Sequence, residues 1–233
     1  MRRYLTEFIG TSFLVFVICC AVASGSPLAP LAIGGALAAV VYAGGHVSGA
    51  HYNPAVTLAV FLRGRLPLGD VAPYAAAQVL GALAGAGAGR LVVGAPAAPA
   101  LQLSGSALVG ALVAEALVTL ALAYVVLNVA TSSAHPDNSF YGLAIGFTVL
   151  AGAVAVGGVS GGVFNPAVAF GVAAQGLVSW SLLWVYLTAN LTGGVLAALL
   201  FRALNPADVA PLPSPVDDGA APVTAGPALL PAE

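Results

Sequence analysis

Two short segments of the chain combine polar residues in an unusual pattern. They are HVSGAHYNPAV at 46–56 and GVSGGVFNPAV at 158–168, and seven of the ten positions from Val47 to Val56 are identical to those from Val159 to Val168. The shared ends are Asn53, Pro54 and Ala55 in the first copy and Asn165, Pro166 and Ala167 in the second. Asn is a favoured N-cap and Pro fits the first helical position, so each motif predicts the start of a helix.

Such helix starts offer hydrogen-bond donors beside a positive helix end. The helix macrodipole places roughly half a positive charge at each N-terminus, and the amides of Asn53 and Asn165 can point hydrogens at a passing oxygen atom. Two such ends facing one cavity repel cations, including hydronium, and favour solutes that accept hydrogen bonds. The alternative is that the motifs are helix caps that only shape a buried turn.

The elements that position these motifs lie in a membrane. The chain is 60% hydrophobic and 6% charged and contains no Lys, a composition that a soluble domain of this size cannot have on its surface. A spanning helix needs about 20 apolar residues. Spans are expected at roughly 5–24, 28–45, 71–89, 106–127, 140–157 and 179–201.

Six spans put both termini on one side of the membrane, and the arginines indicate which side. If the termini are cytoplasmic, only Arg90 lies outside and five arginines lie inside, namely Arg2, Arg3, Arg63, Arg65 and Arg202. Positive residues favour the cytoplasmic side, so we expect a multi-pass protein of the plasma membrane with both termini cytoplasmic. The first apolar segment, which contains Glu7, is expected to be a retained span. The Pro-rich residues 205–233 are expected to form a disordered cytoplasmic tail.

The chain is a duplication with halves at about 1–100 and 101–204, which together form one expected domain at 1–204. The motifs recur at an offset of 112, as from Asn53 to Asn165, and the first spans recur at an offset of 108, as from Glu7 to Glu115. Each half has three spans, an odd number, so the two copies are inverted in the membrane and meet at its midplane. The segments 53–62 and 165–174 are too short to span, and we expect two half-helices that line a cavity.

Glu7 and Glu115 lie inside apolar spans, where a carboxylate costs about 2.5–3.5 kcal/mol. They therefore need partners, and the unpaired backbone N–H groups of the half-helix loops are candidates. The other reading is a proton relay, but no row of titratable groups accompanies them. We expect them to support the loops.

His46 and His51 precede the first half-helix, and Gly158 and Val163 stand at the matching positions of the second copy. This mismatch excludes a symmetric metal site. Each histidine is either a packing residue or a cytoplasmic gate that changes charge near neutral pH. Cys19 and Cys20 are adjacent in a helix and badly placed to bridge, so neither a disulfide nor a metal site is expected.

With these motifs in place, the chain resembles the aquaporin family, also called the major intrinsic proteins. The resemblance rests on SGAHYNPAVT, SGGVFNPAV, TEFIGT, AEALVT and YAAAQVLGALAG and covers residues 4–202. It implies an all-α membrane bundle of six spanning helices and two half-helices, with a pore in each protomer of a homotetramer. It also implies that Asn53 and Asn165 orient permeating molecules. The sequence contains no nucleophile-base arrangement, metal cluster or phosphate loop, so we expect no enzymatic activity and no cofactor, and we expect no nucleic-acid partner.

The resemblance fails at the narrow filter, where the family usually has an Arg directly after the second Asn-Pro-Ala. That position is Val168, and the other three filter positions fall on Ile33, Ala153 and Gly162. Such a filter is wider and more apolar, and it lacks one electrostatic barrier to cations. The glycerol-conducting branch usually has Asp where this chain has Ala169.

The sequence therefore predicts a passive channel for water and small uncharged solutes in a lipid bilayer. One alternative is a facilitator of the glycerol or ammonia type with little selectivity for water. An ion-leak channel and a secondary transporter are further alternatives, because transporters also contain inverted repeats with broken helices.

Overall fold

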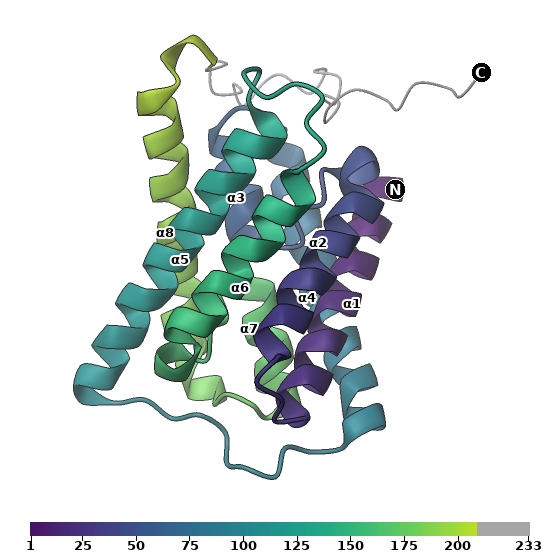
Figure 1. Cartoon of the computed structure of the whole chain (residues 1–233), viewed down its shortest axis with the longest axis vertical. Coiled ribbons are helices and arrows are strands. Elements are labelled where there is room, and N and C mark those ends of the chain that lie inside the picture. The colour runs from purple at the N-terminus through teal and green to yellow at the C-terminus, as the bar shows by residue number, and fades with distance from the viewer. Residues whose placement is uncertain (209–233) are drawn as a thin grey trace.

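A computed structural model describes residues 1–208 of the chain, which form one helical bundle (Figure 1). The six long helices are α1 (Arg2–Ala23), α2 (Ala29–Ser48), α4 (Leu68–Val93), α5 (Gly105–Thr131), α6 (Tyr141–Ser160) and α8 (Leu183–Leu204). The two short apolar helices are α3 (Pro54–Leu62) and α7 (Pro166–Gln175). All six predicted spans correspond to helices long and apolar enough to cross a membrane. The all-α fold with two half-helices is confirmed.

The helices differ from the predicted spans mainly at their ends. The fourth helix runs from Leu68 to Val93 rather than from 71 to 89, and the second ends at Ser48 rather than at 45. Charged or polar residues interrupt the apolar runs at these ends, namely Asp70, Arg90 and His46, so hydropathy alone places the span boundaries too early. Two 3-10 turns complete the described helices, η1 at Trp180–Leu182 and η2 at Pro206–Asp208.

The second 3-10 turn changes the expected tail. Residues 205–208 were expected to be disordered, but Pro206–Asp208 forms a turn, and Asp208 accepts a hydrogen bond from the Ser133 amide at 3.0 Å. A carboxylate there finds a donor in the loop between α5 and α6, and the disordered tail stays a prediction. The remainder, 209–233, lies outside the described residues.

The inverted repeat is visible in the packing. Helix α1 packs along α4 in the first half, and α5 packs along α8 in the second. A Cβ on Gly81 would overlap the carbonyl oxygen of Phe8, and a Cβ on Gly193 would lie 2.6 Å from that of Ala116. The same close approach therefore occurs twice, at the offsets of 112 and 108 that the sequence contains.

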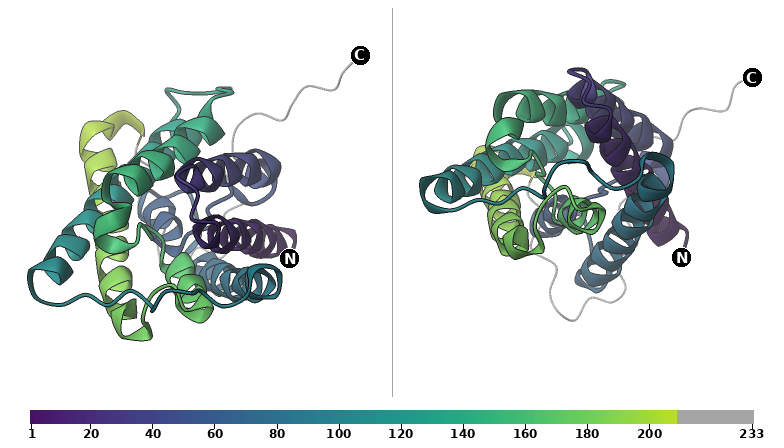
Figure 2. Two further views of the ribbon diagram at one scale, coloured as in Figure 1. Left: turned by 60° about the horizontal axis from the view of Figure 1, so that its bottom comes forward. Right: turned by 90° about the horizontal axis from the view of Figure 1, so that it is seen from below.

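The two halves meet where α2 crosses α6. A Cβ on Gly34 would lie 2.7 Å from the Gly146 carbonyl oxygen, and a Cβ on Gly146 would overlap the Gly34 carbonyl oxygen. These glycines match each other in the two repeats, so the pseudo-twofold axis of the bundle passes between them. Figures 1 and 2 show the helices arranged around the two short helices, with α1 beginning and α8 ending at the same end of the bundle.

Candidate functional site

The two half-helices begin as their sequences predict. Asn53 and Asn165 are N-caps with extended backbone, and their side-chain oxygens accept hydrogen bonds from the Ala55 and Ala167 amides, each at 2.9 Å. Pro54 and Pro166 occupy the first helical positions. The local rules for helix starts therefore explain both half-helices.

Each of the two Asn side chains also donates a hydrogen bond to the loop of the other repeat. The Asn53 amide donates to the Phe164 carbonyl at 2.9 Å, and the Asn165 amide donates to the Tyr52 carbonyl at 2.8 Å. One hydrogen of each amide is therefore used to join the repeats. The second hydrogen of each amide is the one that a solute in the cavity can use.

Glu7 holds the loop before α3. Its Oε1 accepts from the Ser48 hydroxyl at 2.6 Å and the His51 amide at 3.0 Å. Its Oε2 accepts from the Tyr52 amide at 2.6 Å and the Gln78 side chain at 2.8 Å. The carboxylate is completely buried and has two partners on each oxygen.

Glu115 does the same for the loop before α7. It accepts from the Ser160 hydroxyl at 2.7 Å, the Val163 amide at 2.9 Å and the Phe164 amide at 2.6 Å. The hydroxyls of Tyr74 and Tyr186 complete the two frames by donating to the carbonyls of Ser48 and Ser160. These serines and tyrosines had no predicted role, although each pair matches at the offset of 112.

These hydrogen bonds hold strained backbone. Tyr52 and Phe164 have φ values of 48° and 51°, and Ala50 has a φ of 50°, in the left-handed region that side chains rarely adopt. Such conformations cost of order 1 kcal/mol or more and cluster at functional sites, where surrounding contacts enforce them. The contacts here are the two buried glutamates.

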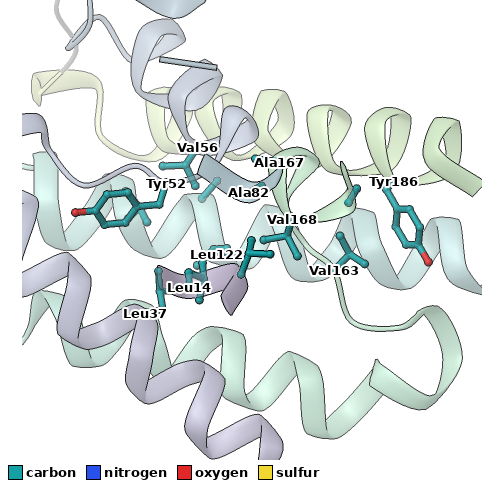
Figure 3. Packing of buried hydrophobic residues seen from close by; sticks show 14 of the residues in the cluster. Leu14, Leu37, Tyr52, Val56, Ala82, Leu122, Val163, Ala167, Val168 and Tyr186 are labelled. Carbon is teal, nitrogen blue, oxygen red and sulfur yellow. The ribbon is translucent and has the colours of Figure 1, made fainter. Parts of the chain in front are cut away.

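The loops and half-helices border one cavity of about 160 Å³. Its wall includes both Asn53 and Asn165 and all four predicted filter residues, which are Ile33, Ala153, Gly162 and Val168. Figure 3 shows the packing of buried hydrophobic residues in this part of the bundle, with Tyr52 and Tyr186 at opposite ends of the labelled cluster and Val168 between them. The structure thus brings together the motif residues and the filter residues that the sequence placed far apart.

The wall of the cavity follows the repeat. We call the half toward the chain termini the inner half and the other the outer half. Matching residues of the two repeats line both, in the pairs Val56 and Val168, Ile145 and Ile33, Leu122 and Leu14, and His51 and Val163. His51 is therefore the main polar difference between the two halves.

The structure separates the two histidines. His51 is buried in the wall of the inner half, with Nδ1 3.1 Å from the Thr57 hydroxyl and its ring 5.1 Å from that of Tyr74. His46 is exposed on the last turn of α2 and is not part of the cavity wall. His46 therefore lies outside the cavity, and a gate at the cytoplasmic mouth formed by this residue stays a prediction.

Arginines cap the C-terminal ends of both half-helices. From the sequence, these arginines indicated only the orientation in the membrane. The Arg202 side chain donates to the Leu62 carbonyl at the end of α3 at 3.2 Å, and Arg90 donates to the Gln175 carbonyl at the end of α7 at 2.9 Å. Arg90 and Arg202 match at the offset of 112, so each repeat caps the half-helix of the other. A cation at a helix C-terminus interacts favourably with the negative end of the helix macrodipole.

A buried ion pair also holds the C-terminal end of α3 at the inner surface. The Arg63 side chain has no exposed surface, lies 3.0 Å from the Asp208 carboxylate and donates to the Thr131 carbonyl at 3.1 Å. Arg65 lies 3.5 Å from the same carboxylate. The end of α3 is thus fastened to the region after α8, whereas among the described residues the end of α7 has no such ion pair.

Comparison with known proteins gives a consistent result. The family model of the major intrinsic proteins matches residues 1–201. The glycerol uptake facilitator protein-like 6 of Lactiplantibacillus plantarum is 38% identical over 219 residues, which cover 89% of this chain and all of that protein. Aquaporin NIP1-1 of Oryza sativa subsp. japonica is 36% identical, covering 88% of this chain and 75% of that one.

Structure comparison supports the same fold. The X-ray structure of the aquaglyceroporin from Plasmodium falciparum matches with a TM-score of 0.76 at 24% identity, covering 88% of this chain and 97% of that one. The family model covers nearly all of the described residues, and several relatives exceed one-third identity. The chain therefore belongs to the major intrinsic protein family of membrane channels.

Proposed function

We propose that this protein is a passive channel for water and small uncharged solutes, with its permeation path in the cavity between the two half-helices. The observation that carries the proposal is that one cavity has both Asn53 and Asn165 in its wall. The positive ends of α3 and α7 meet there, and their combined charge opposes cations. The free amide hydrogens supply donors to a neutral solute.

The four residues Ile33, Ala153, Gly162 and Val168 form the filter in this proposal. None of their side chains carries a charge or a polar atom, so the filter admits solutes larger than water. This favours the second candidate, a facilitator of the glycerol or ammonia type. The printed name of one relative, a glycerol uptake facilitator protein-like protein, is consistent with it.

Glu7 and Glu115 serve as supports of the half-helix loops rather than as a proton relay. Both are buried with their oxygens paired, and neither belongs to the cavity wall. A secondary transporter generally needs a coupling-ion site within the membrane. These two carboxylates do not supply one, which argues for a channel. As in its family, the chain acts without enzymatic chemistry or a cofactor.

The assembly and location follow the same reasoning. We assign a homotetramer in the plasma membrane with both termini cytoplasmic, as family membership and the arginine distribution favour. Helix faces that remain apolar and exposed, for instance Leu5, Ile9 and Phe13 on α1, then contact neighbouring protomers or lipid.

Stopped-flow light scattering on proteoliposomes tests the function. Under an impermeant osmolyte, vesicles with the protein should shrink several times faster than empty vesicles. Val168→Trp, which fills the cavity, should remove the acceleration, whereas Leu91→Trp at a residue 89% exposed should not. Equal rates in empty and protein-containing vesicles, for water and for every solute, would contradict the proposal.

A further inference from the structure

Three arginines gather around one carboxylate at the inner end of the bundle. The guanidinium groups of Arg63 and Arg65 lie 3.0 Å and 3.5 Å from the same oxygen of Asp208. Arg202 donates to the carbonyl of Leu62, the residue before Arg63, at 3.2 Å. The ion pairs among the described residues bring no other carboxylate to these arginines. The cluster therefore combines three positive charges with one negative charge.

Donors from separate elements converge on the Asp208 carboxylate. Both guanidinium contacts fall on its Oδ1, and the Ser133 amide donates to its Oδ2 at 3.0 Å. Ser133 belongs to the loop between α5 and α6, whereas the two arginines follow α3. Guanidinium and backbone N–H groups bind carboxylate and phosphate oxygens by the same charge-assisted hydrogen bonds. We call the three arginines and the Ser133 amide the inner anion site.

The arginine at the base of the inner anion site is held in place by the protein. The Arg63 side chain has no exposed surface, and its Nε and Nη2 donate to the hydroxyl and the carbonyl of Thr131 at 3.2 Å and 3.1 Å. Its guanidinium also lies 4.6 Å from the centre of the Phe201 ring. An anion that binds here does not have to order this side chain, which lowers the entropic cost of binding.

A single carboxylate does not use all the donors of the inner anion site. Nη1 of Arg63 and Nε of Arg65 are buried and have no hydrogen-bond partner among the described residues. A phosphate monoester carries a charge of about −1.5 to −2 near neutral pH and has three strong acceptor oxygens. Its charge and its acceptors therefore match three arginines better than one carboxylate does.

We propose that the inner anion site binds a phosphate monoester and that Asp208 fills the site when this anion is absent. Arg65 and Arg202 are partly exposed, so the anion reaches the site from the inner surface. It displaces the carboxylate and thereby releases Pro206–Asp208 from the loop between α5 and α6. The ligand is the headgroup of an acidic phospholipid such as phosphatidic acid or free inorganic phosphate, because both present the same group. The proposal does not depend on the channel function.

Asp208 acts as a tethered competitor in this proposal. A ligand joined to its site by a short segment has an effective concentration of roughly millimolar, and a free anion must overcome it. Asp208→Asn keeps the shape of the side chain and removes its charge, which weakens its hold on the arginines. The dissociation constant for phosphate should therefore be lower in Asp208→Asn than in wild type, by roughly fivefold or more.

Asp70→Asn is the matched control, because it removes the same charge elsewhere at the inner end. Asp70 pairs with Arg3 and accepts a hydrogen bond from the Tyr4 hydroxyl at 2.6 Å, and neither partner belongs to the inner anion site. A general effect of net charge would strengthen phosphate binding equally in both variants. We expect Asp70→Asn to bind phosphate as wild type does.

Thermal unfolding of the full chain in a neutral detergent measures the binding. Sodium phosphate is titrated against sodium chloride of equal ionic strength, and a ligand of the folded state raises the unfolding temperature as its concentration increases. Phosphate should stabilise the protein more than chloride does. Arg65→Gln should raise the dissociation constant by roughly fivefold or more. This position is chosen because its side chain is 29% exposed, whereas Arg63 is buried.

Phosphatidic acid and phosphatidylcholine, added to the detergent in equal amounts, distinguish the two sources of the anion. A lower dissociation constant for phosphatidic acid than for inorganic phosphate, with no stabilisation by phosphatidylcholine, assigns the lipid headgroup. Binding of inorganic phosphate at least as tight as that of phosphatidic acid assigns the free anion. The proposal is overturned if phosphate and phosphatidic acid stabilise neither wild type nor Asp208→Asn beyond chloride and phosphatidylcholine. Equal phosphate binding by Asp208→Asn and Asp70→Asn would also overturn it.

Discussion

The inner and outer halves of the cavity share one frame but differ in chemistry. Both have a buried glutamate, a serine, a tyrosine and an Asn-capped half-helix at matching positions. They differ where His51, Thr57 and Gln78 in the first repeat are replaced by Val163, Ala169 and Asn190 in the second. The fold therefore uses the same frame twice. Of the positions that differ, only His51 and Val163 lie in the cavity wall, and we expect solute recognition to depend on these two.

The polar network is also tighter in the inner half. The Gln78 amide donates both to Glu7 at 2.8 Å and to the Thr57 hydroxyl at 2.9 Å. Asn190 is shorter, so its oxygen accepts from Thr119 at 3.0 Å while its amide nitrogen has no hydrogen-bond partner among the described residues. The inner loop is therefore held by one more side chain than the outer loop.

The largest expected effect comes from removing the buried glutamates. Glu7→Ala leaves four donors without an acceptor, and each buried donor left unpaired costs about 1–3 kcal/mol. Glu115→Ala leaves fewer donors unpaired, so its cost should be smaller. We expect the yield of monodisperse protein in detergent to fall in both variants, and more in Glu7→Ala.

Glu7→Gln is the control, because it keeps the shape and one acceptor but turns an amide toward the donors. It should lie between wild type and Glu7→Ala in the temperature of half-unfolding. If Glu115→Ala proves as harmful as Glu7→Ala, the inner loop is not the better supported of the two.

The next prediction concerns Val168, which matches Val56 of the inner half. Val168→Arg adds bulk and charge to the outer half of the cavity and should raise the barrier to glycerol by about 1.4 kcal/mol, which corresponds to roughly a tenfold loss of glycerol flux. Water is smaller and should lose roughly threefold or less. Glycerol and water fluxes into proteoliposomes measure this, and equal losses for both would show that Val168 does not limit solute size.

Much of the fold could be predicted because the same supporting residues occur in both repeats of the sequence. Hydropathy located the six spans, the offset of 112 paired Asn53 with Asn165, and local capping rules explained both half-helix starts. The repeat alone did not predict that Ile33 and Ala153 lie in the cavity wall, because each is on a long helix at a distance from the motifs in sequence. The family resemblance supplied it.

Contacts that occur once could not be predicted in this way. The ion pair of Arg63 with Asp208 joins a loop to the segment after α8, and no periodicity marks such a pair. His46 and His51 are close in sequence, but α2 ends between them at Ser48, so one is exposed and the other is buried. The reciprocal arginines at 90 and 202 could have been found from the repeat, since they match at the same offset as the motifs.

A smaller effect on stability is expected from exchanging the side-chain amides at the matching positions 78 and 190. Gln78→Asn should shorten the side chain so that Glu7 and Thr57 lose a donor, and a net hydrogen bond contributes about 0.5–1.5 kcal/mol. Asn190→Gln should extend the second-half amide toward Glu115 and stabilise the protein, or at least not destabilise it. Thermal unfolding of both variants in detergent measures this, and a loss of stability in Asn190→Gln would show that the outer loop lacks space for the longer side chain.

The smallest effect is expected at Asp208, which secures the inner end of α3 and has no counterpart at the outer end of α7 among the described residues. Burial opposes ionisation of this carboxyl, but hydrogen bonds from Ser132 and Ser133 and the charge of Arg63 outweigh it and lower its pKa. Because the folded-state pKa is below that of the unfolded chain, the contribution to stability is complete above the ordinary carboxyl pKa and is lost as the pH falls through the folded value. Asp208→Asn keeps an acceptor oxygen for the buried Arg63 side chain and loses only the charge. It should therefore lower the unfolding temperature at neutral pH by a few degrees, as expected for about 1 kcal/mol, and the difference from wild type should disappear in acid. A difference that persists unchanged in acid would mean that the shape of the side chain, and not its charge, holds the inner end of the half-helix.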